Sequence, residues 1–222
     1  MSVSAKGARK PKSKFLSGSQ LFTYSDFVLY EGPGARFYAL AQVDVIEGFH
    51  SIRHNFERLC YACYFMEVAD KALLAGENCD DILRLILKAL TALTKERVQP
   101  ALAARVFEFS FLAAMGYLPE LYACGHCGEP IGCLAMESEP PKYYFSEHGT
   151  ICPRCRPNAG RVVPLSANTL FALRYILENE LNRRFAFTAD ERIRQELQKA
   201  AKLFMTAHIG YRFKSLELLP GE

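Results

Sequence analysis

Residues 124–155 read CGHCGEPIGCLAMESEPPKYYFSEHGTICPRC, and the rest of the chain can be interpreted around this segment. It contains two Cys-x-x-Cys pairs, Cys124 with Cys127 and Cys152 with Cys155, separated by a polar insert rich in turn-forming residues. Each pair can place two thiolates on one turn, and two such turns supply the four sulfur ligands of a closed, tetrahedral zinc site. Because four thiolates leave no open coordination position, the predicted zinc is structural.

Disulfides, a redox pair or four free thiols are the alternatives for these cysteines. Disulfide frameworks belong to short secreted chains with a signal peptide, whereas residues 1–14 here are basic and contain no apolar core segment. A redox Cys-x-x-Cys needs a strand-to-helix setting, and it would not explain why there are two pairs. Eight cysteines without a secretory signal favour a reducing cytosol. The spacing therefore favours zinc over the alternatives.

His126 and His148 lie near the cysteine pairs, and either could replace one cysteine as a ligand. Because each pair is complete without them, solvated loop histidines are the preferred interpretation. A hydrolytic zinc site would need three protein ligands and a water. The zinc-deaminase pattern is missing, since Ile151 rather than a proline precedes Cys152. We therefore expect no enzyme and no catalytic residue at this site.

The charges of the 222-residue chain are unevenly distributed, although its net charge is only +3. Residues 1–14 contain no acid and hold the cations Lys6, Arg9, Lys10, Lys12 and Lys14. Cations that pair with nucleic-acid phosphates release counterions and add affinity that does not depend on sequence. DNA is therefore a plausible partner, and a solvated tail is the alternative. No run of about 18 apolar residues occurs, so no membrane span is expected.

A hairpin is predicted from two aromatic and β-branched runs, residues 21–30 and 36–46, joined by Glu31-Gly32-Pro33-Gly34. A hairpin alone is only marginally stable in water, so it must join other strands or pack on helices. Residues 2–5 read like the end of a further strand.

Helical periodicity begins at Ile52, and a first buried stripe is expected at Phe56, Leu59, Cys60, Cys63, Met66 and Ala69. Cys60 and Cys63 also form a Cys-x-x-Cys, but buried core cysteines are preferred over a metal site because the helix offers no glycine turn. The second helix follows Cys79, with Ile82, Leu83, Ile86, Leu90 and Leu93 inward. A third helix runs from Pro100 to Gly116 and is apolar almost all round, which is typical of a central helix.

After the cysteine segment, whose residues 140–145 are expected to form a strand, two more helices are predicted. Ser166 is the candidate N-cap of the first, and Thr188 with Glu191 has the spacing of a capping box for the second. The second helix also carries a basic face, made of Arg192, Arg194, Lys199 and Lys202. An ordinary solvated face is preferred here over the rim of a binding surface.

Taken together, these features resemble the RecO family of bacterial recombination-repair mediators. The matching segments are residues 5–13, 42–49, 57–62, 107–119 and 210–215, together with the two Cys-x-x-Cys pairs. They cover essentially the whole chain in the family's order. Only the cysteines are specific when taken alone, so the resemblance depends on the succession of segments.

The resemblance implies an α+β protein in which a partial OB-like domain, residues 1–48, precedes a helical domain, residues 49–222, with an inserted zinc module at about 122–160. It implies a non-enzymatic protein of the bacterial cytoplasm and nucleoid. Such a protein binds single- and double-stranded DNA, anneals complementary strands and contacts the C-terminal tail of single-strand-binding protein. It also works with RecR to load RecA. A zinc-stabilised interaction scaffold with weak or no DNA binding is the alternative.

The family's basic loop corresponds here to Lys6, Arg9, Lys10, Lys12 and Lys14, and its metal ligands to Cys124, Cys127, Cys152 and Cys155. One departure concerns the barrel. An OB fold needs five strands, and this chain begins near the end of the second, so roughly 30 residues of the family pattern are expected to precede Met1. Either the start codon is assigned too late or the protein has only a remnant barrel. The first explanation is preferred, and a chain extended at its N-terminus is then expected to have the higher melting temperature.

Overall fold

The computed structural model describes residues 2–31, 37–74, 79–132 and 143–219. Contacts divide the chain into two compact units, Met1–Asn55 and Phe56–Glu222. The first unit contains a small sheet, and the second contains a helical bundle with a second small sheet. The α+β class predicted from the sequence is therefore confirmed.

The first unit is built on three strands, β1 (Val3–Ser4), β2 (Tyr24–Tyr30) and β3 (Tyr38–Glu47), in the order β1-β3-β2. β2 and β3 pair antiparallel as the predicted hairpin, and β1 pairs parallel with β3. The predicted turn at 32–34 lies outside the described residues. The short helices η1 (Ser17–Ser19) and η2 (His50–His54) complete the unit.

The second unit contains six α-helices within the described ranges: α1 (Phe56–Ala72), α2 (Asp80–Thr94), α3 (Pro100–Ala114), α4 (Ala167–Glu178), α5 (Leu181–Arg184) and α6 (Glu191–His208). Its sheet has the strand order β5-β4-β6, made of β4 (Tyr143–Ser146), β5 (Gly149–Ile151) and β6 (Val163–Leu165). Two short helices, η3 (Arg156–Asn158) and η4 (Leu216–Leu218), follow β5 and α6.

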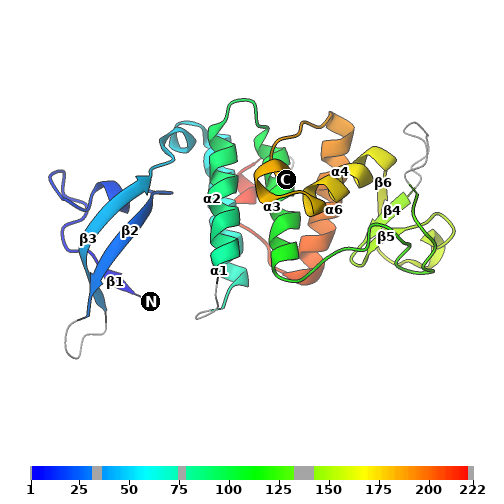
Figure 1. Cartoon of the computed structure of the whole chain (residues 1–222), viewed down its shortest axis with the longest axis horizontal. Helices are drawn as coiled ribbons and strands as arrows, with labels where there is room; N and C mark the ends of the chain where they lie inside the picture. Colours follow the sequence, from blue (N-terminus) through cyan, green and yellow to red (C-terminus); the bar gives the residue numbers. More distant parts are fainter. Residues whose placement is uncertain (1, 32–36, 75–78, 133–142, 220–222) are drawn as a thin grey trace. The chain divides into compact units, whose positions relative to one another are not determined.

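α3 is the central helix of this unit, as its apolar sequence predicts. Every residue from Leu102 to Leu112 is buried, and α3 contacts α1, α2, α4 and α6 (Figure 1). Its Phe107 stacks on Phe65 of α1 with 4.3 Å between ring centroids. On its other side, Phe109 packs edge-on against Phe145 of β4 at 6.0 Å. Aromatic packing from α3 therefore connects the bundle to the second sheet.

Two predicted helix faces were partly wrong. In α1, Phe56 is 63% exposed and Met66 is 45% exposed, whereas Tyr64 and Phe65 are buried. In α2, Leu83 is 43% exposed. Apolar residues encircle much of α1, so its buried face is determined by the positions of α2, α3 and η4 rather than by the apolar pattern alone. Cys60 is buried, and Cys63 is half-buried.

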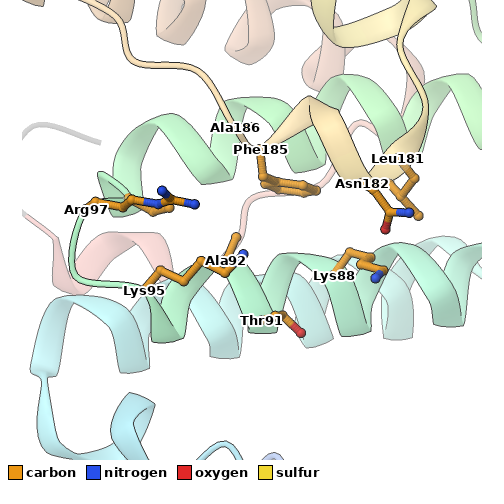
Figure 2. Close-up of a pocket in the computed structure, with 10 residues that line it drawn as sticks. Lys88, Thr91, Ala92, Lys95, Arg97, Leu181, Asn182, Phe185 and Ala186 are labelled. Carbon is orange, nitrogen blue, oxygen red and sulfur yellow. The ribbon is translucent and has the colours of Figure 1, made fainter.

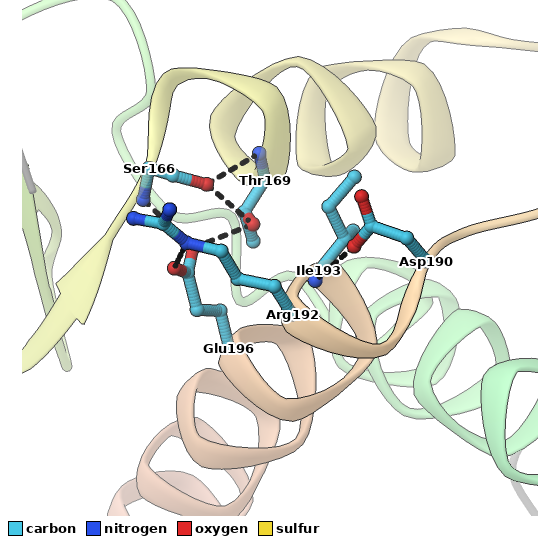
Figure 3. A network of polar contacts seen from close by, with 6 residues as sticks. All are labelled: Ser166, Thr169, Asp190, Arg192, Ile193 and Glu196. Atoms are coloured by element: carbon cyan, nitrogen blue, oxygen red, sulfur yellow. Dashed lines mark hydrogen bonds and ion pairs between the residues drawn. The ribbon is translucent and has the colours of Figure 1, made fainter. Parts of the chain in front are cut away.

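Side-chain caps fix the starts of α4 and α6 (Figure 3). Ser166 caps α4 by accepting a hydrogen bond from the Thr169 N–H, as predicted. The capping box of α6 was wrong, because its N-cap is Asp190, whose Oδ1 accepts from the Ile193 N–H at 2.8 Å. An aspartate immediately before the first turn is as good a cap as a threonine, and the chain uses the nearer residue.

Candidate metal centre and nucleic-acid interface

The first Cys-x-x-Cys pair lies on a tight turn held by backbone hydrogen bonds. The Cys124 N–H donates to the Glu129 carbonyl at 2.8 Å, and the Gly128 N–H donates to the Cys124 carbonyl at 2.8 Å. Gly128 has φ +73°, a left-handed conformation that glycine adopts without a steric penalty. These bonds turn the backbone between the two sulfurs of the pair.

The second pair begins directly after β5. The Cys155 N–H donates to the Cys152 carbonyl at 3.1 Å, which forms a second turn. A hydrogen bond connects the two turns, because the Gly125 N–H donates to the Thr150 carbonyl at 2.9 Å. The two turns are therefore joined through the backbone.

This geometry brings the four predicted cysteines together. The sulfurs of Cys124, Cys127, Cys152 and Cys155 all lie within 4.8 Å of one another, and the first, third and fourth residues are buried. Cys127 Sγ and Cys152 Sγ are 3.9 Å apart. Four ligands at about 2.3 Å from a tetrahedral zinc would be roughly 3.8 Å apart, so the cluster fits a closed four-sulfur site.

The two histidines near the cysteines lie outside this group. His126 is exposed, and the side chain of His148 is 76% exposed and directed at Glu147. Among the residues that the structure describes, the four-cysteine group is the one that could hold a metal. The solvated-histidine interpretation fits this arrangement.

Electrostatics in the cluster favour one thiolate over another. Burial acts to raise the pKa of Cys124, but the N–H groups of Cys152, Cys127 and His126 point at its sulfur and lower the pKa to about 6. Burial, together with hydrogen bonds among the four thiols, raises the pKa of Cys155 to about 12. Of these two cysteines, the fold therefore favours the thiolate of Cys124.

Arg174 of α4 holds the first turn against the helices. Its side chain is buried, and Nη2 donates to the Leu121 carbonyl at 2.6 Å and the Ile131 carbonyl at 3.0 Å. The guanidinium also lies 4.1 Å from the ring centroid of Tyr122. Arg174 thus contacts the chain before and after the first cysteine pair. The sequence gives no signal for this role, because the contacts depend on residues far apart in the chain.

Gly149, which precedes the second cysteine turn, lies close to the backbone of Glu120, which precedes the first cysteine turn. The Glu120 N–H donates to the His148 carbonyl at 3.1 Å, and the Thr150 N–H donates to the Glu120 carbonyl at 2.7 Å. A Cβ on Gly149 would lie 2.2 Å from the Glu120 carbonyl oxygen, and its φ is +117°. Only glycine fits this position without movement of the backbone.

The predicted DNA contacts lie on the first unit, on a segment made of consecutive turns. Lys6, Arg9, Lys10 and Lys12 are exposed, and their side chains have no ion pair or hydrogen bond among the described residues. Lys14 differs, because its Nζ donates to the Ala41 carbonyl at 3.0 Å. Residues 6–14 are called the basic segment below.

Further predicted features can be placed in the same way. Tyr30, one aromatic of the hairpin, is 63% exposed. On α6, Arg192 pairs with Glu196 at 3.2 Å and Arg194 pairs with Glu191, so half of the predicted basic face is neutralised. For these two arginines, this fits the interpretation of an ordinary solvated face. Within the described ranges, no helix is both long and apolar enough to cross a membrane.

Comparison with known proteins gives consistent matches over the whole chain. The family model described as Recombination protein O C terminal matches residues 53–217, and the model described as Recombination protein O N terminal matches residues 1–49. The DNA repair protein RecO of Acetivibrio thermocellus is 32% identical over 219 residues, which cover 99% of this chain and 84% of the relative. The protein of the same name from Anaeromyxobacter dehalogenans strain 2CP-C is 31% identical, with 99% and 84% covered. That from Alkaliphilus metalliredigens is 28% identical, with 96% and 84% covered.

The fold, the four-cysteine module and these matches define a DNA repair and recombination protein of the α+β class. The C-terminal family model alone spans well over half of the chain. The chain belongs to the RecO family.

Proposed function

We propose that this chain is a non-enzymatic recombination mediator. It binds single- and double-stranded DNA, anneals complementary strands and, with RecR, helps to load RecA on DNA coated with single-strand-binding protein. Membership of the RecO family supports the role in DNA repair and recombination. The basic segment supports the direct contact with DNA.

The observation that carries this proposal concerns four of the five cations of the basic segment. These four are Lys6, Arg9, Lys10 and Lys12, which are exposed and unpaired among the described residues. Asp26 and Asp44 of the same unit are also exposed, but neither forms an ion pair with these cations. Consecutive turns order the segment, and the buried Phe15 anchors its end. A backbone held in turns can present such cations to the phosphate backbone at a lower entropic cost than a disordered tail does.

We also propose that the metal of the four-cysteine cluster is zinc and that it stabilises the fold. The soft donor set and the absence of an open position support a structural site. Metal analysis is expected to give one zinc per chain, and X-ray absorption is expected to give four sulfur neighbours. Fewer sulfurs together with an oxygen or nitrogen neighbour would favour a hydrolytic site instead.

A groove of the second unit suits the C-terminal tail of single-strand-binding protein. It has a volume of about 480 Å³, and its lining includes the buried Tyr64, Met205 and Phe213 and the exposed Lys202 and Arg212. Two other cations line the groove, but Arg212 is paired with Glu217 at 2.8 Å and the buried Arg105 with Glu108 at 3.1 Å, so Lys202 is the exposed cation that we expect to meet a terminal carboxylate. We expect Lys202→Glu to weaken binding of the tail peptide at least tenfold and Lys199→Glu, outside the groove, to leave it unchanged.

Binding of a fluorescent single-stranded oligonucleotide at several salt concentrations tests the DNA-binding proposal. The logarithm of affinity is expected to fall linearly with the logarithm of salt concentration, by about 0.7 per phosphate contact. Replacing Lys6, Arg9, Lys10 and Lys12 by alanine is expected to reduce that slope by up to about 3. Lys199→Ala is the matched control. Negligible, salt-insensitive binding by the unaltered chain would contradict the proposal and favour the interaction scaffold.

A further inference from the structure

A second basic site lies on the helical unit, in a groove between α2 and the α5 segment (Figure 2). Figure 2 shows Lys88, Thr91 and Lys95 along one side, with Asn182 and Phe185 on the other. The volume of the groove is about 240 Å³. All of these residues belong to the same compact unit, Phe56–Glu222.

The groove is strongly cationic. Lys88, Lys95 and Arg97 line it and are exposed, and none of its lining residues in the described part of the chain is acidic. The side chains of these three cations have no ion pair or hydrogen bond within the described ranges. Glu96 is next to two of them in the chain but does not line the groove. On α6, in contrast, both Arg192 and Arg194 have acidic partners. Unpaired cations that share a groove create a positive potential that attracts an anion.

The spacing of the cations suits an extended ligand. Lys88 lies on α2 and Lys95 is the C-cap residue that directly follows the helix, so the seven residues between their positions correspond to about 10 Å along the axis. Thr91 lies between them, and its hydroxyl donates to the Leu87 carbonyl at 2.7 Å. Sites that enclose a small molecule have volumes of about 300 to 1,000 Å³, so this groove is smaller than such a site. It therefore suits one unit of a longer anionic chain that continues beyond it.

The opposite wall identifies the class of that chain. Phe185 is half-buried and presents a ring on which a base can stack, and the Asn182 amide is exposed. Cations along one wall and an aromatic ring on the other are the combination used by sites for single-stranded nucleic acid. An acidic peptide could pair with the cations, but it would gain less from the Phe185 ring and the Asn182 amide.

We propose that this groove binds single-stranded DNA, with Lys88, Lys95 and Arg97 on consecutive phosphates and one base against Phe185. This inference rests on the proposed DNA-binding function and adds a contact on the helical unit to that of the basic segment. A mediator that contacts a strand through both units can hold it over a longer length than the basic segment spans.

Oligonucleotide binding by the full chain tests the groove. The variant K88A/K95A/R97A is expected to bind a labelled thymidine oligonucleotide at least tenfold more weakly, with a salt slope reduced by about 2. Phe185→Leu removes the stacking surface but no charge, so it should weaken binding without changing the slope. Lys199→Ala is the matched control on α6. Each variant is also compared with the unaltered chain by circular dichroism and thermal melting.

Several results would overturn the proposal. If the unaltered chain binds the oligonucleotide and the basic-segment variant loses affinity while the groove variant does not, the groove is not a DNA site and the proposed function stands. If neither the unaltered chain nor any variant binds the oligonucleotide, both this inference and the proposed DNA-binding function are wrong. If inorganic phosphate or thymidine monophosphate competes as well as the unlabelled oligonucleotide, the groove is a site for a free phosphate. If the groove variant loses affinity only for an acidic peptide, the occupant is a peptide.

A photochemical measurement gives a readout that does not depend on affinity. An oligonucleotide containing 5-iodouracil, which cross-links to nearby aromatic rings, is irradiated with the chain, and the cross-linked peptides are identified by mass spectrometry. A cross-link at Phe185 is expected, and it should disappear in Phe185→Leu. Cross-links confined to the first unit would contradict the inference.

Discussion

The backbone N–H of Cys152 donates a hydrogen bond to the Sγ of Cys124, with 3.3 Å between nitrogen and sulfur. The two residues belong to different Cys-x-x-Cys pairs, so this bond joins the two halves of the module through one of the proposed metal ligands. An N–H group directed at sulfur favours the thiolate, which is the form that binds a metal. The hydrogen bond therefore favours the form of Cys124 that the proposed zinc would need.

Cys127→Ser is expected to remove the metal and lower stability, because a closed site contributes folding free energy. A loss of about 3 kcal/mol would lower the melting temperature of a chain of this size by roughly 6 to 12 °C. Metal content and thermal melting are measured together. Cys79→Ser, outside the four-cysteine cluster, is the control and should retain the metal. A variant that lost the metal but melted at the original temperature would show that the metal is not structural.

Gly149→Ala is expected to destabilise the module more than Gly128→Ala. Both glycines have positive φ, but a Cβ at Gly149 would overlap the backbone of Glu120, whereas one at Gly128 would meet no atom within 4 Å. Gly128→Ala should lower the free energy of unfolding by about 1 kcal/mol because of backbone strain. Gly149→Ala should lower it by at least about 2 kcal/mol more, because of the overlap. Chemical denaturation measures both. Equal losses would mean that the backbone near Glu120 adjusts freely.

Arg174→Met should detach the first cysteine turn from α4. It leaves the carbonyls of Leu121 and Ile131 without the Arg174 side chain, which is expected to cost about 2 to 4 kcal/mol. Limited proteolysis should then cut the module faster, and denaturation should begin at a lower denaturant concentration. Arg161→Met removes an exposed arginine and is the control. Unchanged proteolysis in Arg174→Met would contradict the anchoring role.

Glu196 makes stability depend on pH. Burial acts to raise its pKa, but hydrogen bonds from Thr169, Ser166 and Arg192 outweigh burial and hold the pKa below 4.5 (Figure 3). A carboxyl whose pKa is lowered by folding stabilises the fold above its unfolded pKa, and this contribution is lost as the pH falls through the folded pKa. The free energy of unfolding should therefore decrease in acid below about pH 4.5.

Glu196→Gln is the variant that tests this dependence. It should cost about 1 to 3 kcal/mol at neutral pH, since it removes the charged acceptor of the Ser166 N–H and the Thr169 hydroxyl. The difference from the unaltered chain should shrink in acid. Denaturation at pH 7 and pH 4 measures it, and a difference that stayed constant would contradict the assignment.

Local patterns predicted several parts of this fold. The spacing of the four cysteines, the continuous apolar composition of α3 and the serine before α4 each have one dominant physical explanation. The face of α1 could not be predicted, since apolar residues surround most of the helix and its neighbours select the buried side.

Features that depend on contacts between distant segments could not be predicted from the sequence either. Arg174 meets the first cysteine turn through a long-range contact, and the groove on the helical unit combines α2 with a four-residue helix that has no periodic signal. Such sites become visible only when the elements are placed together.

Strand annealing is the measurement with which we would begin. Two complementary oligonucleotides are coated with the cognate single-strand-binding protein, and the rate of duplex formation is followed with and without the metal-loaded chain at low and physiological salt. We predict that the chain accelerates annealing of the coated strands and that the basic-segment variant loses most of this effect. A folded, metal-loaded chain that left the rate unchanged at both salt concentrations would contradict the proposed mediator function.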